Sequence, residues 1–111
     1  GENISSFQVE QELVAFAGIK AAAAYAVPDG NGDFELMAAV ELGQEHSLNV
    51  KALSAFLRER LPVHMVPRFL RIDKNLPRST SDKLNKVTLI QNGVTSDSID
   101  LVAHMASNVG N

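Results

Sequence analysis

Two apolar segments separated by a dense turn signal constrain the fold of this 111-residue chain more than any other feature. The turn is the run PDGNGD at residues 28–33, whose glycines and asparagine adopt the backbone angles that tight turns need. Residues 34–42 then alternate between two sets of side chains, as a half-buried strand does, with Glu35 and Glu41 in the more polar set. Residues 19–27 are apolar except for one lysine. The pattern predicts an antiparallel hairpin, although the four consecutive alanines in the first segment, taken alone, favour a helix.

The chain before the hairpin predicts a helix over residues 6–17. Ser5 is placed to cap its first turn, with a glutamine three residues on, and apolar side chains recur at helical spacing. Two acidic residues of this segment, Glu10 and Glu12, are expected to face solvent. Gly18 fits the left-handed residue that closes such a helix.

Similar signals define the elements after the hairpin. Asn49 is placed to cap a second helix, which Pro62 ends because proline cannot continue the hydrogen-bond ladder. A third, short strand is predicted over residues 69–72 and a short helix over residues 85–91. Residues 99–105 predict a further, marginal helix.

This order of elements predicts an α+β fold, in which helices flank a small, mostly antiparallel three-stranded sheet made of the hairpin and one further strand. The length favours a single domain, which we expect over residues 1–94, followed by a C-terminal tail over residues 95–111. There is no cysteine, which excludes a disulfide scaffold and thiol catalysis. The sequence shows neither an apolar run of about 20 residues nor a secretory signal, so a cytoplasmic protein is expected.

Charge is distributed unevenly along the chain, whose formal net charge is −3. Residues 1–50 contain one base and eight acids, whereas residues 51–86 contain nine bases and three acids. A net negative chain is not expected to bind nucleic acid. The basic segment can attract a phosphate-bearing ligand or an acidic partner, but a solvated face is the simpler interpretation, and charge alone favours it.

Several short motifs, in a fixed order, are more specific than the charge. The sequence LPVHMVPRF at residues 61–69 is followed by LPRSTSDKLNK at residues 76–86. The chain opens with GENIS, continues with VE at residues 9–10, and has YAVPD at residues 25–29. Over residues 1–93 these motifs resemble the C-terminal domain of the adenylate-forming acyl-CoA synthetases, and most closely the fatty-acid and carnitine-type CoA ligases of the AMP-binding enzyme superfamily.

The resemblance implies a two-step reaction in a larger parent enzyme. A carboxylate attacks the α-phosphate of ATP to give an acyl-adenylate and pyrophosphate, and the thiol of CoA then displaces AMP. In this family the C-terminal domain rotates against an N-terminal adenylation domain between the steps. The implied cofactors of the parent are ATP, CoA and Mg²⁺, bound mostly by the N-terminal domain, and its substrate is a carboxylic acid. The chain alone is therefore expected to be inactive, and membrane association of the parent stays open.

The resemblance also assigns roles to individual residues. Lys83 falls on the catalytic lysine of the adenylation step, and Gly1 falls on a glycine of the CoA tunnel, where the missing side chain permits close approach. Arg78 and Lys86 fall on basic positions and are expected to contact the cofactor or support the loop, with a solvated side chain as the other interpretation. Asp82 stands where the family usually has glycine; aspartate tolerates left-handed backbone, but its carboxylate could pair with Lys83 or repel phosphate.

The chemistry of the first step suits a lysine independently of the family. Attack of a carboxylate on a phosphate brings two anions together, and a positioned ammonium offsets their repulsion. At about 4 Å and an effective dielectric constant of ~20, such a pair is worth roughly 4 kcal/mol. The three histidines lack metal-ligand spacing, so no metal site is predicted in this chain. The alternative function is a free-standing, non-catalytic binding module for an acidic partner or an anionic metabolite, which Asp82 favours.

Overall fold

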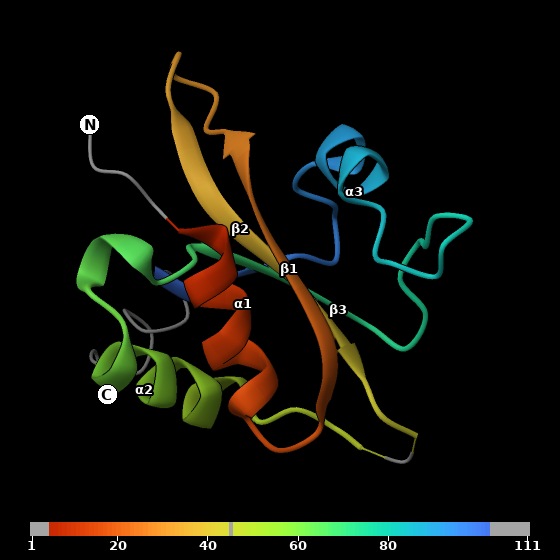
Figure 1. The fold of residues 1–111 in the computed structure, drawn as a ribbon. Helices are drawn as coiled ribbons and strands as arrows, with labels where there is room; N and C mark the ends of the chain where they lie inside the picture. The colour runs from red at the N-terminus through yellow and green to blue at the C-terminus, as the bar shows by residue number, and fades with distance from the viewer. Residues whose placement is uncertain (1–4, 45, 103–111) are drawn as a thin grey trace.

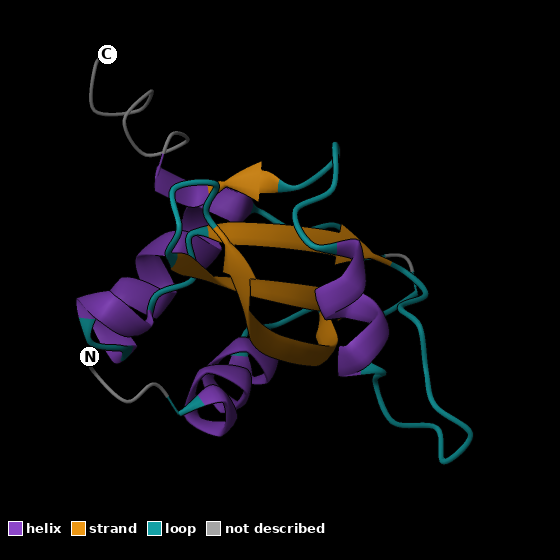
Figure 2. Ribbon diagram, turned by 90° about the horizontal axis from the view of Figure 1, so that it is seen from above, coloured by secondary structure: helices purple, strands orange, loops and turns teal. Residues whose placement is uncertain are grey.

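The computed structural model describes residues 5–44 and 46–102, and in this part of the chain four strands form one mixed sheet (Figure 1). The elements in chain order are α1 (Ser6–Ala15), β1 (Ile19–Pro28), β2 (Phe34–Leu42), α2 (Val50–Arg60), the 3₁₀ turn η1 (Val63–Met65), β3 (Phe69–Asp73), α3 (Lys86–Asn92) and β4 (Ile99–Asp100). The strands are adjacent in the order β1-β2-β3-β4. Helices α1 and α2 pack against one face of the sheet and α3 packs against the other (Figure 2).

The predicted hairpin is confirmed, including the strand that carries the alanine run. Successive alanines point to opposite faces of β1, and Ala23 and Ala24 are each 1% exposed because both faces are covered. Burial on both sides outweighs the small intrinsic helix preference of alanine. Asp29 holds the turn, since its Oδ1 accepts hydrogen bonds from the N–H groups of Asn31 at 2.7 Å and Asp33 at 3.2 Å.

The sheet contains two antiparallel pairings and one parallel pairing. β3 runs parallel to β2, which requires the chain to cross back over the sheet between them, and α2 with η1 makes this crossover. The α+β class and the mostly antiparallel sheet are confirmed. The described residues contain four strands, however, and not the three that the sequence predicts.

The additional strand, β4, covers the first two residues of the marginal helix that the sequence pattern predicts over residues 99–105, and the helical prediction is wrong at these two positions. Residues 101–102 are helical, as predicted. β4 pairs antiparallel with β3, whose open edge supplies backbone partners that a local pattern cannot reveal. Arg68, just before β3, links the two strands that flank β3: its guanidinium donates to Glu35 Oε1 on β2 at 3.2 Å and to Asp100 Oδ2 on β4 at 3.3 Å. Residues 103–105 lie outside the described part of the chain.

The capped helix starts are confirmed. Ser5 Oγ accepts the N–H of Gln8 at 3.2 Å, and Asn49 Oδ1 accepts the N–H of Ala52 at 3.0 Å. The short third helix starts in the same way, with Asn85 as its cap. No helix within residues 5–44 and 46–102 has the length and apolar character needed to cross a lipid bilayer.

Helix α1 ends at Ala15, two residues before the predicted end at residue 17. Phe16 adopts an extended backbone, and its ring packs edge-on against that of Phe56 in α2, with the ring centroids 5.2 Å apart. At Phe16 the chain has left α1 and contacts α2 instead of continuing the helix. Gly18 follows with a φ of +96°, which confirms its predicted left-handed conformation and turns the chain into β1.

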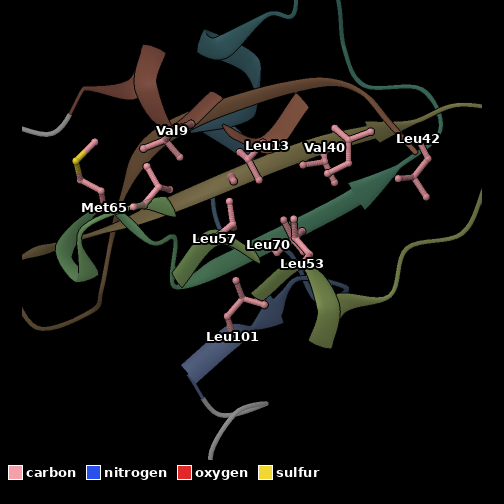
Figure 3. Close-up of a cluster of buried hydrophobic side chains, with 13 residues drawn as sticks. Val9, Leu13, Val40, Leu42, Leu53, Leu57, Met65, Leu70 and Leu101 are labelled. Atoms are coloured by element: carbon pink, nitrogen blue, oxygen red, sulfur yellow. The ribbon is translucent and has the colours of Figure 1, made fainter. Parts of the chain in front are cut away.

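The buried side chains form two clusters, one on each face of the sheet. The larger cluster joins α1, α2 and the sheet through residues such as Val9, Leu53 and Leu70, all fully buried (Figure 3). Leu101 joins it from within the segment expected to be the tail and is 2% exposed. The smaller cluster packs α3, through Leu89, against the opposite face. This second face carries the loop in which Lys83 lies.

Candidate active-site loop

The segment between β3 and α3 is a hairpin-like loop that projects beyond the sheet (Figure 1). Arg78 and Leu84 form an antiparallel bridge at its base. Toward the tip, the N–H of Ser79 donates to the carbonyl of Lys83 at 2.8 Å, and the N–H of Asp82 donates to the carbonyl of Ser79 at 3.0 Å. These bonds fix the backbone on either side of Lys83.

Asp82 occupies the bend of this loop in the left-handed region, with a φ of +64°, and is the one non-glycine residue with positive φ in the described chain. A glycine is the usual residue for such a bend, because a side chain on left-handed backbone costs energy. The carboxylate of Asp82 is 90% exposed and points toward Arg78, with 3.9 Å between Oδ1 and Nε. The loop therefore keeps a glycine-like geometry with aspartate in it.

Lys83 is exposed at the edge of an open groove of about 410 Å³. The groove is lined by α1, by residues 21–23 of β1, and by Arg78, Lys83, Leu84 and Lys86. An ammonium group on a loop of fixed backbone, beside an open groove, is available to an anionic group that approaches from outside this domain.

Lys86, the first residue of α3, is held by α1. Its Nζ lies 2.7 Å from Glu10 Oε2 and donates to Ser6 Oγ at 3.4 Å. The same oxygen of Glu10 accepts the backbone N–H of Ala24 at 2.8 Å. The sequence pattern predicts that Glu10 faces solvent, and this prediction is wrong. Its side chain is 22% exposed and accepts the N–H of Ala24 in β1, the edge strand of the sheet.

Arg78 also makes its contacts within the domain. Its Nη1 donates to the carbonyl of Asp82 at 3.0 Å, and its Nη2 donates to Glu41 Oε1. Glu41 comes from β2, and its other carboxylate oxygen, Oε2, accepts the N–H of Leu76 at 2.8 Å. Glu41 is only 2% exposed, although the alternating pattern of β2 places it among the more polar side chains of the strand.

Burial raises the pKa of Glu41, but the hydrogen bonds from Leu76 and Arg78, with the charges of Arg78 and Lys20, lower it more. The net pKa lies below the ordinary value, so Glu41 is ionised at neutral pH. No local signal marks Glu41 as special, because the residues that it binds lie 35 and 37 positions later in the chain.

The structure therefore brings three of the four predicted site residues to one place. Arg78, Lys83 and Lys86 line the same groove. Gly1 lies outside the described residues. Sequence reasoning missed Glu10 and Glu41, the two carboxylates that hold the basic residues Lys86 and Arg78.

Comparisons with known proteins identify the family. The model of the AMP-binding enzyme C-terminal domain matches residues 8–83. The chain is 35% identical over 91 residues to the steroid-22-oyl-CoA synthetase of Rhodococcus jostii, a match that covers 80% of this chain and 16% of that protein. It is 32% identical over 91 residues to the mitochondrial malonate–CoA ligase of Homo sapiens, covering 82% of this chain and 16% of that protein. The chain belongs to the family of AMP-binding enzyme C-terminal domains, and it spans 16% of the length of these two relatives.

Solved structures agree with this assignment. The amide bond synthetase McbA from Marinactinospora thermotolerans superposes with a TM-score of 0.71 and 28% identity, over 80% of this chain and 18% of that one. A benzoate CoA ligase from Burkholderia xenovorans LB400 gives a TM-score of 0.72 and 28% identity, over 80% of this chain and 19% of that one. The resemblance inferred from the motifs is thereby confirmed.

Proposed function

We propose that the chain acts as the mobile C-terminal domain of an ATP-dependent acyl-CoA synthetase, with Lys83 as the catalytic lysine of the adenylation step. The observation that carries this proposal is the position of Lys83, exposed beside an open groove on a loop with fixed backbone, in a chain of this family. The relatives named above include a steroid-22-oyl-CoA synthetase and a malonate–CoA ligase, which supports a CoA ligase as the parent.

The proposed reaction forms an acyl-adenylate and then a thioester. The substrate carboxylate attacks the α-phosphate of ATP and pyrophosphate leaves; the sulfur of CoA then attacks the acyl carbon and AMP leaves. Lys83 acts in the first step, where its ammonium offsets the repulsion between the carboxylate and the phosphate. A compact ammonium on a flexible side chain also suits a group that arrives and leaves as the domain moves.

The remaining ligands of this reaction belong mostly to the N-terminal adenylation domain of the parent. Mg²⁺ neutralises phosphate charge when it is bound, but the described residues hold no cluster of three histidine or acidic side chains that could bind a metal ion. We therefore assign the Mg²⁺ ligands, with the rest of the ATP site, to the N-terminal domain. Gly1 stays a prediction for the CoA tunnel, and Arg78 and Lys86 are assigned to support of the loop, because carboxylates of this domain hold both.

The test is a comparison of the two half-reactions in the parent enzyme. Exchange of labelled pyrophosphate into ATP measures adenylation, and release of AMP from preformed acyl-adenylate with CoA measures thioester formation. Candidate acids are a steroid-22-oate, malonate and benzoate, from the names of the related proteins, and a fatty acid, from the motif resemblance. An enzyme that forms no acyl-adenylate from any acid, yet retains an acidic protein partner whose binding weakens with salt, would support the binding module instead.

A further inference from the structure

The loop that carries Lys83 is attached to the sheet through one buried carboxylate. Glu41 is the last residue but one of β2, and both of its carboxylate oxygens bind the loop. Oε2 accepts the N–H of Leu76, where the loop begins, and Oε1 accepts Nη2 of Arg78. Lys20 lies at the edge of contact distance, with 4.0 Å between its Nζ and Oε1, and is itself 66% exposed. The two residues that donate hydrogen bonds to the Glu41 carboxylate, Leu76 and Arg78, therefore both belong to the loop.

Arg78 extends this attachment to the tip of the loop. Its Nη1 donates to the carbonyl of Asp82 at 3.0 Å, and this carbonyl belongs to the peptide group that leads into Lys83. The chain of contacts thus runs from the sheet through Glu41 and Arg78 to the peptide that precedes Lys83. A shift of Arg78 would therefore displace or break the hydrogen bond that holds this peptide.

The environment of Glu41 explains why this attachment is rigid. A carboxylate that is 2% exposed has lost its water and must have strong partners to stay ionised. A bond between an ionised donor and an ionised acceptor is about twice as strong as a neutral hydrogen bond. The ion pair between Arg78 and Asp82 in the same loop is weaker, because the carboxylate of Asp82 is exposed to water.

We propose that Glu41 is a positioning residue for adenylation: through Arg78 it sets the place of Lys83 without touching substrate. The inference rests on the role proposed above for Lys83. Because Glu41 acts through Arg78, we expect substitutions of Glu41 and Arg78 to have the same effect and not to add. Misplacement of a reacting group by about 1 Å is sufficient for a rate loss near 100-fold, which sets the scale of the effect.

The test uses Glu41→Gln in the parent enzyme, with Glu35→Gln as the matched control. Glu35 also lies on β2 and also binds an arginine, since Arg68 Nη1 donates to its Oε1 at 3.2 Å, but this arginine lies just before β3 and not in the loop. We expect Glu41→Gln to lower the rate of adenylation about 10- to 100-fold. We expect the rate of thioester formation from preformed acyl-adenylate to change less than about 2-fold, and Glu35→Gln to leave both rates within about 2-fold.

A second readout does not depend on activity. Hydrogen–deuterium exchange of peptides that cover residues 76–86 should accelerate at least about 10-fold in Glu41→Gln and stay unchanged in Glu35→Gln, because loop bonds such as Ser79 N–H to Lys83 O lose their support. The double variant with Arg78→Gln should adenylate no more slowly than the slower single variant, as expected for residues that act as a unit. If Glu41→Gln does not yield folded enzyme, Arg78→Gln alone decides, with the same expectations.

Two outcomes would overturn the inference: a rate of adenylation that falls equally in Glu41→Gln and Glu35→Gln, or loop exchange that does not change. A Lys83→Ala variant measured beside them separates this failure from that of the proposed function. If Lys83→Ala adenylates normally, the proposed role of Lys83 fails. If only Lys83→Ala loses adenylation, the role of Lys83 stands and the role of Glu41 fails.

Discussion

Lys86 at the start of α3 and Glu10 in α1 form an ion pair with 2.7 Å between Nζ and Oε2, and this pair joins the two sides of the groove beside Lys83. The same Glu10 oxygen accepts the N–H of Ala24 at the edge of the sheet. One carboxylate therefore connects α1, β1 and α3. The geometry of the groove therefore depends on this carboxylate as well as on the loop.

Replacing Lys83 with alanine should separate the two half-reactions of the parent enzyme. Removal of one preorganised charge lowers a rate by about 10²–10³, and we expect this loss in adenylation measured by pyrophosphate exchange. Thioester formation from preformed acyl-adenylate should change much less. Lys74→Ala is the matched control, because Lys74 is also an exposed lysine in a turn but lies outside the groove lining. Equal losses in both half-reactions would contradict the role of Lys83.

Replacing Glu10 with alanine should destabilise the fold. The buried N–H of Ala24 then lacks its acceptor, which costs about 1–3 kcal/mol in the free energy of unfolding measured with urea. Glu12→Ala is the control, because Glu12 only approaches the half-exposed Arg60, at 3.7 Å, and such pairs are worth less than about 1 kcal/mol. A loss from Glu12→Ala as large as that from Glu10→Ala would show that the bond to Ala24 is not the cause.

The low pKa of Glu41 predicts a dependence of stability on acidity. A carboxyl whose pKa is lower in the folded than in the unfolded chain binds protons more readily when unfolded, so it stabilises the fold above its ordinary pKa of 4.5. This contribution is lost as pH falls from that value through the lowered pKa of the folded state. Urea unfolding at a series of pH values should show a weaker decline below pH 4.5 in Glu41→Gln than in the wild type. Parallel curves for the two proteins would mean that the pKa of Glu41 is not lowered.

The left-handed backbone of Asp82 predicts a ranking of substitutions. Glycine adopts a φ of +64° without strain, whereas alanine has the same Cβ as aspartate and no polar group to bond nearby atoms. We expect Asp82→Ala to be less stable than Asp82→Gly by about 1 kcal/mol in thermal or urea unfolding. Asp82→Gly should also adenylate at least as fast as the wild type, since it keeps the bend and removes a carboxylate next to Lys83. Slower adenylation in Asp82→Gly would show that this carboxylate assists the reaction.

Much of the fold follows from short stretches of sequence. The caps Ser5 and Asn49 bind N–H groups three positions away, and Asp29 closes its turn within four positions. Such bonds form from neighbouring residues alone, so the sequence pattern predicts the helix starts and the hairpin turn. The motif around Lys83 likewise predicts the family and the candidate catalytic residue without reference to the fold.

The capped helices, the hairpin and the place of Lys83 in a polar loop can be predicted from the sequence, because these features depend on residues close together in the chain. The pairing of β4, the early end of α1 and the partners of Glu10 and Glu41 depend instead on contacts between distant parts of the chain. Glu41 meets Leu76 across 35 positions, and Lys86 meets Ser6 across 80. A charged residue on an amphipathic element looks the same in sequence whether it faces water or a distant backbone group. Which of the two it faces depends on how the separate elements pack.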